Sequence, residues 1–126
     1  MKCDIIIPIY NAYDCLAECF DSILRYTDLA RSRIILVNDQ SPDSRVLPLL
    51  KEYEKAHRGK VIVLENEHNL GFVGTVNRGM KYSKNDVLLL NSDTVVTKNW
   101  LSKLQACAYR HESVATATPL SNNFTP

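Results

Sequence analysis

The chain has 126 residues, of which 15 are Lys or Arg and 14 are Asp or Glu, so its formal net charge at pH 7 is +1. This balance excludes a nucleic-acid binder that works through a large basic face, and it excludes a polybasic membrane anchor. The chain is 45% apolar and 23% charged, as in ordinary globular domains. The length predicts one domain over residues 1–126, and no apolar run approaches the roughly 18 residues of a membrane span.

Four apolar runs predict β-strands that are buried on both faces, at 5–9, 34–37, 61–64 and 87–90. The first run, Ile5-Ile6-Ile7-Pro8-Ile9, carries its proline near the end, where a missing backbone donor is tolerated. A fifth, shorter strand is predicted at 114–118. Strands of this kind belong to a parallel sheet covered on both sides.

Amphipathic segments between the strands predict helices. The first is expected to be capped by Asn11 or Asp14, and the second to start at Ser41-Pro42-Asp43 with Ser41 as N-cap. A third is predicted from Phe72 to about Tyr82. A fourth is predicted after Thr97 or Asn99, with an apolar stripe made by Trp100, Leu101, Leu104 and Cys107.

Alternating strands and helices predict an α/β fold, a Rossmann-like doubly wound and mostly parallel sheet. Ligands bind such sheets at the carboxyl ends of the strands. Polar residues follow each strand in this sequence: Tyr10-Asn11, Asn38-Asp39, 65–69 and Asn91-Ser92-Asp93. We therefore expect these residues to gather along one edge of the sheet.

Asp93 and Asp39 are the clearest candidates for chemistry at that edge. Each carboxylate can hold a divalent cation, or it can cap a neighbouring segment, and the sequence leaves both possibilities open. Gly74 and Gly79 lie in a predicted helix, where glycine is unfavourable. They indicate close approach of the backbone, either to the sheet or to a ligand. His68 lies in the polar loop before that helix and remains a possible ligand contact.

Several other enzyme classes are excluded by the motifs. The sequence contains no GxGxxG after the first strand, no GxxxxGK[ST] and no GxSxG. The four cysteines (Cys3, Cys15, Cys19 and Cys107) form no CxxC pair and are interpreted as small apolar side chains in a reducing cytoplasm. A receiver domain needs an acidic pair after the first strand, where this chain has Tyr10-Asn11.

Four segments in one order carry a resemblance to a known family: 5–11 (IIIPIYN), 37–43 (VNDQSPD), 69–72 (NLGF) and 89–93 (LLNSD). Together with Asn99-Trp100-Leu101 they resemble the donor-binding half of a family 2 inverting glycosyltransferase with the GT-A fold. The resemblance covers about residues 3–120. The Asn-Leu-Gly-Phe form is similar to a rhamnosyltransferase-like branch of the family.

The resemblance implies a nucleotide-sugar site. Asp39 would accept a hydrogen bond from the imide N–H of the base, and Asp93, at the family's DXD position, would bind Mg²⁺ or Mn²⁺. The residues implied to bind the nucleotide-sugar are Pro8, Ile9, Tyr10, Asn11, Asp39, Asn69, Gly71, Asn77, Asn91 and Ser92.

Two departures from the family pattern affect this implied site. Asn91 replaces the first Asp of the DXD motif. Thr75-Val76-Asn77 replaces the common Ala-Arg-Asn, although Arg78 is adjacent.

The implied function is transfer of a hexosyl or deoxyhexosyl group, with inversion, from a UDP- or dTDP-type donor to an acceptor hydroxyl. The acceptor would be a glycan, a lipid-linked molecule or a protein, as in polysaccharide biosynthesis. The catalytic base is expected beyond Pro126, so the GT-A fold is expected to be truncated here. A non-catalytic nucleotide-sugar binding module is the alternative. The expected location is cytoplasmic, and association with a membrane through segments absent from this sequence is left open.

Overall fold

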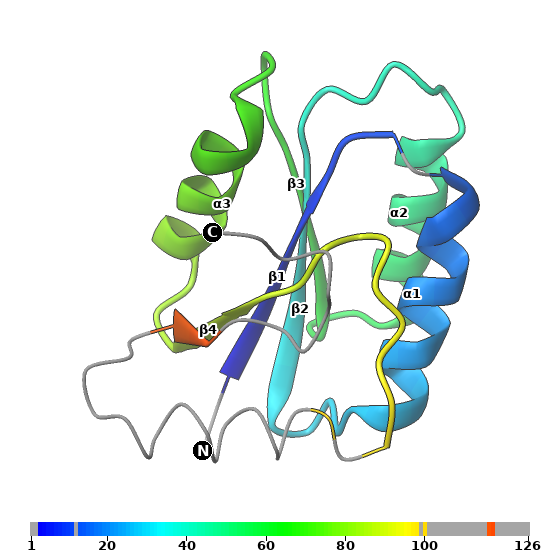
Figure 1. The fold of residues 1–126 in the computed structure, drawn as a ribbon, viewed down its shortest axis with the longest axis vertical. Helices are drawn as coiled ribbons and strands as arrows, with labels where there is room; N and C mark the ends of the chain where they lie inside the picture. Colours follow the sequence, from blue (N-terminus) through cyan, green and yellow to red (C-terminus); the bar gives the residue numbers. More distant parts are fainter. Residues whose placement is uncertain (1–2, 12, 99, 101–115, 118–126) are drawn as a thin grey trace.

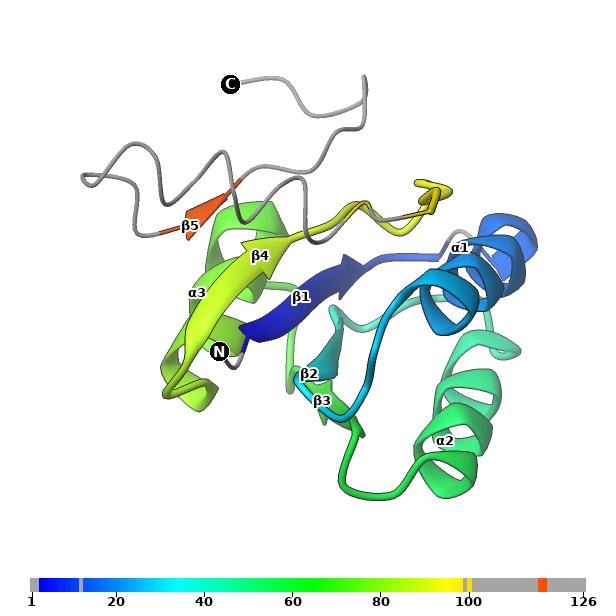
Figure 2. The same cartoon turned by 90° about the horizontal axis from the view of Figure 1, so that it is seen from below.

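A computed structural model describes residues 3–11, 13–98, 100 and 116–117. It shows three layers, with helices α1 and α2 on one face of a parallel sheet and helix α3 on the other (Figures 1 and 2). The strand order is β3-β2-β1-β4-β5, and each neighbouring pair is parallel. The elements in chain order are β1 (Cys3–Ile9), α1 (Tyr13–Tyr26), β2 (Ser32–Asn38), α2 (Val46–Ala56), β3 (Val61–Glu65), α3 (Gly71–Tyr82), β4 (Asp86–Leu89) and β5 (Thr116–Ala117).

The four principal strands predicted from the sequence are confirmed, and the doubly wound α/β fold with them. The described part of the predicted fifth strand is β5, which pairs with β4. The predicted fourth helix lies outside the described residues except for Trp100. That side chain is buried in the main core, and its indole N–H donates to the Thr27 hydroxyl at 2.9 Å.

The expected start of the second helix is wrong. α2 begins at Val46, not at Ser41, and its N-cap residue, Arg45, makes no capping bond with its side chain. Ser41 instead donates to Asn38 Oδ1 at 2.6 Å and accepts from the Asn11 amide at 2.9 Å, so it ties together the loops after β1 and β2. Asn11 has a positive φ of 58°, and its side chain accepts from the Asp43 amide, which adds a second link between these two loops.

Side chains alternate between two cores along each central strand. On β1, Ile5, Ile7 and Ile9 join the large core under α1 and α2, while Ile6 joins the smaller core on the other face. Gly79 of α3 lies directly on this smaller core, because a Cβ at Gly79 would stand only 2.7 Å from Ile6 Cγ2. Close packing on the sheet, the first of the two explanations offered for this glycine, is therefore the correct one.

The amino ends of the strands are held by a buried carboxylate. Asp4 of β1 is 1% exposed and accepts both arms of the Arg33 guanidinium, at 3.1 and 2.8 Å, and the Ser83 hydroxyl. Burial raises the pKa of Asp4, but these bonds and the Arg33 charge outweigh it and leave the pKa below its ordinary value of 3.8. None of the helices in the described part of the chain has the length and apolar character needed to span a bilayer.

Candidate functional site

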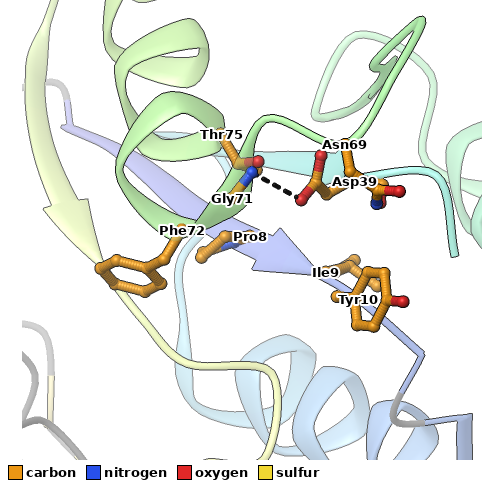
Figure 3. Close-up of a pocket in the computed structure, with 8 residues that line it drawn as sticks. All are labelled: Pro8, Ile9, Tyr10, Asp39, Asn69, Gly71, Phe72 and Thr75. Carbon is orange, nitrogen blue, oxygen red and sulfur yellow. Dashed lines mark hydrogen bonds between the residues drawn. The ribbon is translucent and has the colours of Figure 1, made fainter.

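A pocket of about 430 Å³ opens where β1 and β2 end and α3 begins (Figure 3). This is the edge at which parallel sheets bind ligands. Six residues singled out in the sequence line it, and they are joined by Phe72 and Thr75: the full lining is Pro8, Ile9, Tyr10, Asp39, Asn69, Gly71, Phe72 and Thr75. The convergence predicted for the loops after the first three strands is therefore present in the structure.

Asp39 is the charged group of this pocket. It follows the last residue of β2, is 6% exposed and accepts hydrogen bonds at both of its oxygens. Its Oδ1 accepts from Asn66 Nδ2 at 2.9 Å and from the Leu70 amide at 2.7 Å, and its Oδ2 accepts from the Gly71 amide at 3.1 Å. Asp39 thus caps the amino terminus of α3, where a negative charge is favourable. Asp39 was considered as a cap for the helix that directly follows it in sequence; it caps α3 instead, and it also faces the pocket (Figure 3).

The surroundings of Asp39 keep it ionised. Burial raises the pKa of the carboxyl, but hydrogen bonds from Asn66, from the Leu70 and Gly71 amides and from Thr75 outweigh burial, and the pKa lies below its ordinary value. A carboxylate in this state only accepts hydrogen bonds. The pocket therefore presents a fixed acceptor to any ligand that enters it.

Two polar residues of this network, Asn66 and Arg78, were not among the predicted site residues. Asn66 is 1% exposed and donates to both Asp39 and Thr75, and its own Oδ1 accepts from Arg78 at 2.8 Å. Arg78 also donates to the Glu65 carbonyl. Arg78, which follows directly after the stretch where the family commonly has Ala-Arg-Asn, is thus part of the hydrogen-bond network around Asp39. A signal was available, since Asn66 lies in the polar loop that follows the third apolar run.

Aromatic side chains stand at the rim of the pocket. Tyr10 and Phe72 are each 53% exposed, one at the end of β1 and the other in the first turn of α3. Large flat apolar groups that stay exposed beside a polar acceptor are suited to stacking on a nucleobase. Phe72 was not singled out as a site residue in the sequence.

The remaining predicted residues do not line this pocket. Asn11 holds the loops after β1 and β2 together, and Asn77 is exposed on α3. Asn91 and Ser92 are half-buried and Asp93 is exposed, all three in the segment that follows β4. His68 is exposed in the loop before α3 and is absent from the lining.

The exposure of Asp93 bears on the kind of metal site that it can form. Among the residues that the structure describes, no three His, Cys, Asp or Glu side chains stand close enough to enclose a metal ion. Mg²⁺ is commonly held by one or two carboxylates together with substrate phosphates, and an exposed carboxylate fits that arrangement. An exposed carboxylate such as that of Asp93 is suited to a cation shared with a ligand.

Solved structures share this fold. Staphylococcus aureus TarS 1–349 in complex with UDP superposes with a TM-score of 0.74 and 25% identity, over 89% of this chain and 33% of that one. GalNAc-T7 with UDP, GalNAc and Mn²⁺ superposes with a TM-score of 0.78 and 23% identity, over 87% of this chain and 21% of that one. The arrangement of the sheet and helices is that of the GT-A fold.

Sequence relatives agree with the structural neighbours. The poly(ribitol-phosphate) beta-glucosyltransferase of Bacillus spizizenii is 36% identical over 99 residues, which are 76% of this chain and 15% of that protein. The uncharacterized glycosyltransferase EpsJ of Bacillus subtilis is 34% identical over 101 residues, 79% of this chain and 28% of that protein. The chain thus spans less than a third of the length of either relative. Residues 4–124 match the family model described as Glycosyl transferase family 2, and the chain belongs to this family.

Proposed function

We propose that this chain binds the nucleoside diphosphate part of a nucleotide-sugar in the pocket between β1, β2 and α3. The observation that carries the proposal is the buried, ionised Asp39, held as a fixed acceptor beside exposed Tyr10. Uracil and thymine both present an imide N–H to such an acceptor, so UDP and dTDP donors fit. The volume lies in the range of roughly 300–1,000 Å³ that is usual for small-molecule sites.

Residues of the loops around the pocket have proposed parts in this binding. Pro8, Ile9 and Tyr10 cover the base and ribose, with the Tyr10 ring available for stacking. Asn69 and Gly71 border the base from the start of α3. Asn11 supports the loop that carries Tyr10, through its bond to the Asp43 amide.

The segment after β4 and the outer face of α3 complete the proposed donor site. Asn91 and Ser92 provide polar groups for the hydroxyls of ribose or sugar, and Asn77 contacts the donor from α3. Asn91 brings an amide without charge, so charge for a metal ion comes from Asp93.

Asp93 is proposed to hold Mg²⁺ or Mn²⁺ together with the donor's phosphates. The carboxylate oxygens are hard ligands on an exposed turn, and the distant structural neighbour GalNAc-T7 contains Mn²⁺. A divalent cation, when bound, neutralises the charge that builds up on the departing nucleoside diphosphate.

The proposed reaction is transfer of a hexosyl or deoxyhexosyl group, with inversion, to the hydroxyl of a glycan, lipid-linked or protein acceptor. The base that deprotonates the acceptor is proposed to lie beyond Pro126. A matched relative is named for glucosyl transfer to poly(ribitol-phosphate), which supports a polysaccharide-type acceptor. The proposed location is the cytoplasm. A dTDP-deoxyhexose donor, as in a rhamnosyltransferase-like branch, is the narrower proposal.

Calorimetric titration with UDP, dTDP and CDP, with and without Mn²⁺, tests donor binding. We expect UDP and dTDP to bind at least about tenfold more tightly than CDP, because the cytosine ring nitrogen is an acceptor and would face the Asp39 carboxylate. Asp93→Asn should abolish the Mn²⁺-dependent part of binding. Asp21→Asn, an equivalent change at an exposed position on α1, should not. Equal affinity for all three nucleotides would refute base recognition by Asp39.

A transfer assay separates the enzyme from the non-catalytic alternative. This chain should bind donor without transferring sugar at an appreciable rate, whereas a chain extended past Pro126 should transfer it. Equal transfer by both would place the base within residues 1–126. Binding without transfer by both would favour the non-catalytic module. Competition between UDP-GlcNAc and dTDP-rhamnose then distinguishes the two donor classes.

A further inference from the structure

Asn66 is one of the residues that hold the loop before α3 to the end of β2. Its backbone amide donates to the Asn38 carbonyl at 2.9 Å, and its carbonyl accepts from Gln40 Nε2 at 2.7 Å. Its side chain is buried and makes three further bonds. Every polar group of Asn66 therefore has a hydrogen-bond partner within the protein.

The amide of Asn66 has a single chemically allowed orientation. On one side stands the Asp39 carboxylate, which only accepts, and on the other the Arg78 guanidinium, which only donates. The NH₂ group must therefore face Asp39 Oδ1, at 2.9 Å, and the oxygen must face Arg78, at 2.8 Å. Reversing the amide would place two acceptors together at Asp39 and two donors together at Arg78.

This arrangement fixes the orientation of the Asp39 carboxylate. Oδ1 accepts from both Asn66 and Leu70, Oδ2 accepts from the Gly71 amide, and Thr75 also bonds to the carboxylate. Because bonds reach the two oxygens from different directions, the carboxylate cannot rotate about its own axis. Figure 3 shows the carboxylate joined to Gly71 within the ring of pocket-lining residues.

We infer that Asn66, oriented by Arg78, is a positioning residue that aims the Asp39 carboxylate at the imide edge of a uracil or thymine base and so sets the base selectivity of the pocket. This inference rests on the proposed function, because it assumes that Asp39 meets a base. Asn66 itself is outside the pocket lining and acts through Asp39. Its loss should therefore reduce discrimination at the base edge more than general affinity for a nucleotide.

The test compares binding of UDP with binding of N3-methyl-UDP, in which the imide hydrogen is replaced by a methyl group. The wild-type chain should bind UDP about 10- to 100-fold more tightly than the methylated probe, the range for a charge-assisted hydrogen bond. In Asn66→Leu we expect UDP affinity to fall about tenfold while affinity for N3-methyl-UDP changes less than about threefold. Arg78→Met, which keeps the aliphatic stem but removes the donors, should lower the ratio in the same direction.

Asn85→Leu is the matched control. Asn85 donates to buried Asp4 at 3.4 Å, at the opposite end of the sheet, so this variant should leave the ratio unchanged. A general structural defect in Asn66→Leu would weaken both probes equally and preserve the ratio, which would overturn the inference. If Asn66→Leu does not fold, the ratio in Arg78→Met decides alone.

The two proposals fail in different ways. If the wild-type chain binds both probes equally, Asp39 does not meet the imide edge, and the proposed base recognition and this inference are both wrong. If the wild-type chain discriminates and both Asn66→Leu and Arg78→Met discriminate equally well, the proposed function stands and only the positioning role of Asn66 is refuted.

Discussion

Asp39→Asn should damage stability and nucleotide binding together, for separate reasons. The change keeps the shape of the side chain and removes its charge. The amide oxygen of the substituted side chain can still accept from Asn66 and Leu70, but its NH₂ group then faces the Gly71 amide, which loses its acceptor. The hydrogen bond of the Gly71 amide is only partly buried, so the loss of its acceptor should cost about 1 kcal/mol, the low end of the range for such donors. For a chain of this size that is a fall in Tm of roughly 3–6 °C.

The same NH₂ group would meet the imide N–H of a bound base, so two donors would face each other in the pocket. Loss of a charge-assisted bond predicts UDP binding that is about 10- to 100-fold weaker. Calorimetry at a temperature well below both melting points measures affinity, and a thermal melt measures stability.

Gly59→Ala separates these two effects. Gly59 has φ +81° with nothing within 4 Å of an added Cβ, so alanine there brings only backbone strain of about 1–2 kcal/mol. This control should lower Tm to a similar extent and leave UDP affinity unchanged. If Asp39→Asn lowers Tm but binds UDP as tightly as the wild type, then Asp39 is a helix cap only, and the assignment of base recognition to it is wrong.

Three further predictions concern the rest of the molecule. Gly79→Ala should lower the free energy of unfolding by about 1–2 kcal/mol in a urea titration, because overpacking against β1 exceeds the gain in helix propensity, and unchanged stability would contradict the close contact. Arg33→Met should lower the free energy of unfolding most above pH 3.8, the ordinary pKa of an Asp carboxyl. The pKa of Asp4 is lowered in the folded state. The stability that ionised Asp4 contributes is therefore complete above pH 3.8 and is lost as the pH falls through the lower, folded-state pKa. The difference between variant and wild type in urea should therefore shrink below about pH 4, and a pH-independent difference would refute this linkage. Iodoacetamide at about pH 8 should label exposed Cys15 and should not label Cys19 until the chain unfolds, because burial raises the pKa of the Cys19 thiol to about 12. Peptide mass spectrometry measures the two labelling rates, and equal rates would contradict the burial of Cys19.

Much of the architecture could be predicted from local patterns. An apolar run with no alternation, such as Ile5–Ile9, indicates a strand that is buried on both faces, and this can be predicted without knowing which strands lie beside it. Four such runs separated by helical segments allow few topologies other than a parallel sheet. The carboxyl ends of parallel strands share one edge. For this reason the polar residues after β1 and β2 and before α3 were correctly expected to converge.

The sequence did not reveal which of those residues bond to one another, because the hydrogen bonds join residues that are far apart in the chain. Asp39 was considered as a cap for the helix that follows it, and instead caps α3, whose first amides lie 31 and 32 residues further on. Asn66 carries no signal of its own beyond its place in a polar loop. Its importance appears only when the fold brings Asp39 to one side of it and Arg78 to the other.

The local hydrophobic pattern therefore determined where the strands lie and at which edge of the sheet the pocket opens, since each residue's own polarity indicates whether it is buried. Only the tertiary structure decided which donors satisfy Asp39, because a buried carboxylate takes its partners from whatever the packing places within hydrogen-bond distance. It also decided that Asn91, Ser92 and Asp93 share the carboxyl edge without lining the same pocket. Sequence order identifies strand ends, but the distances between them depend on how helices and sheet pack together.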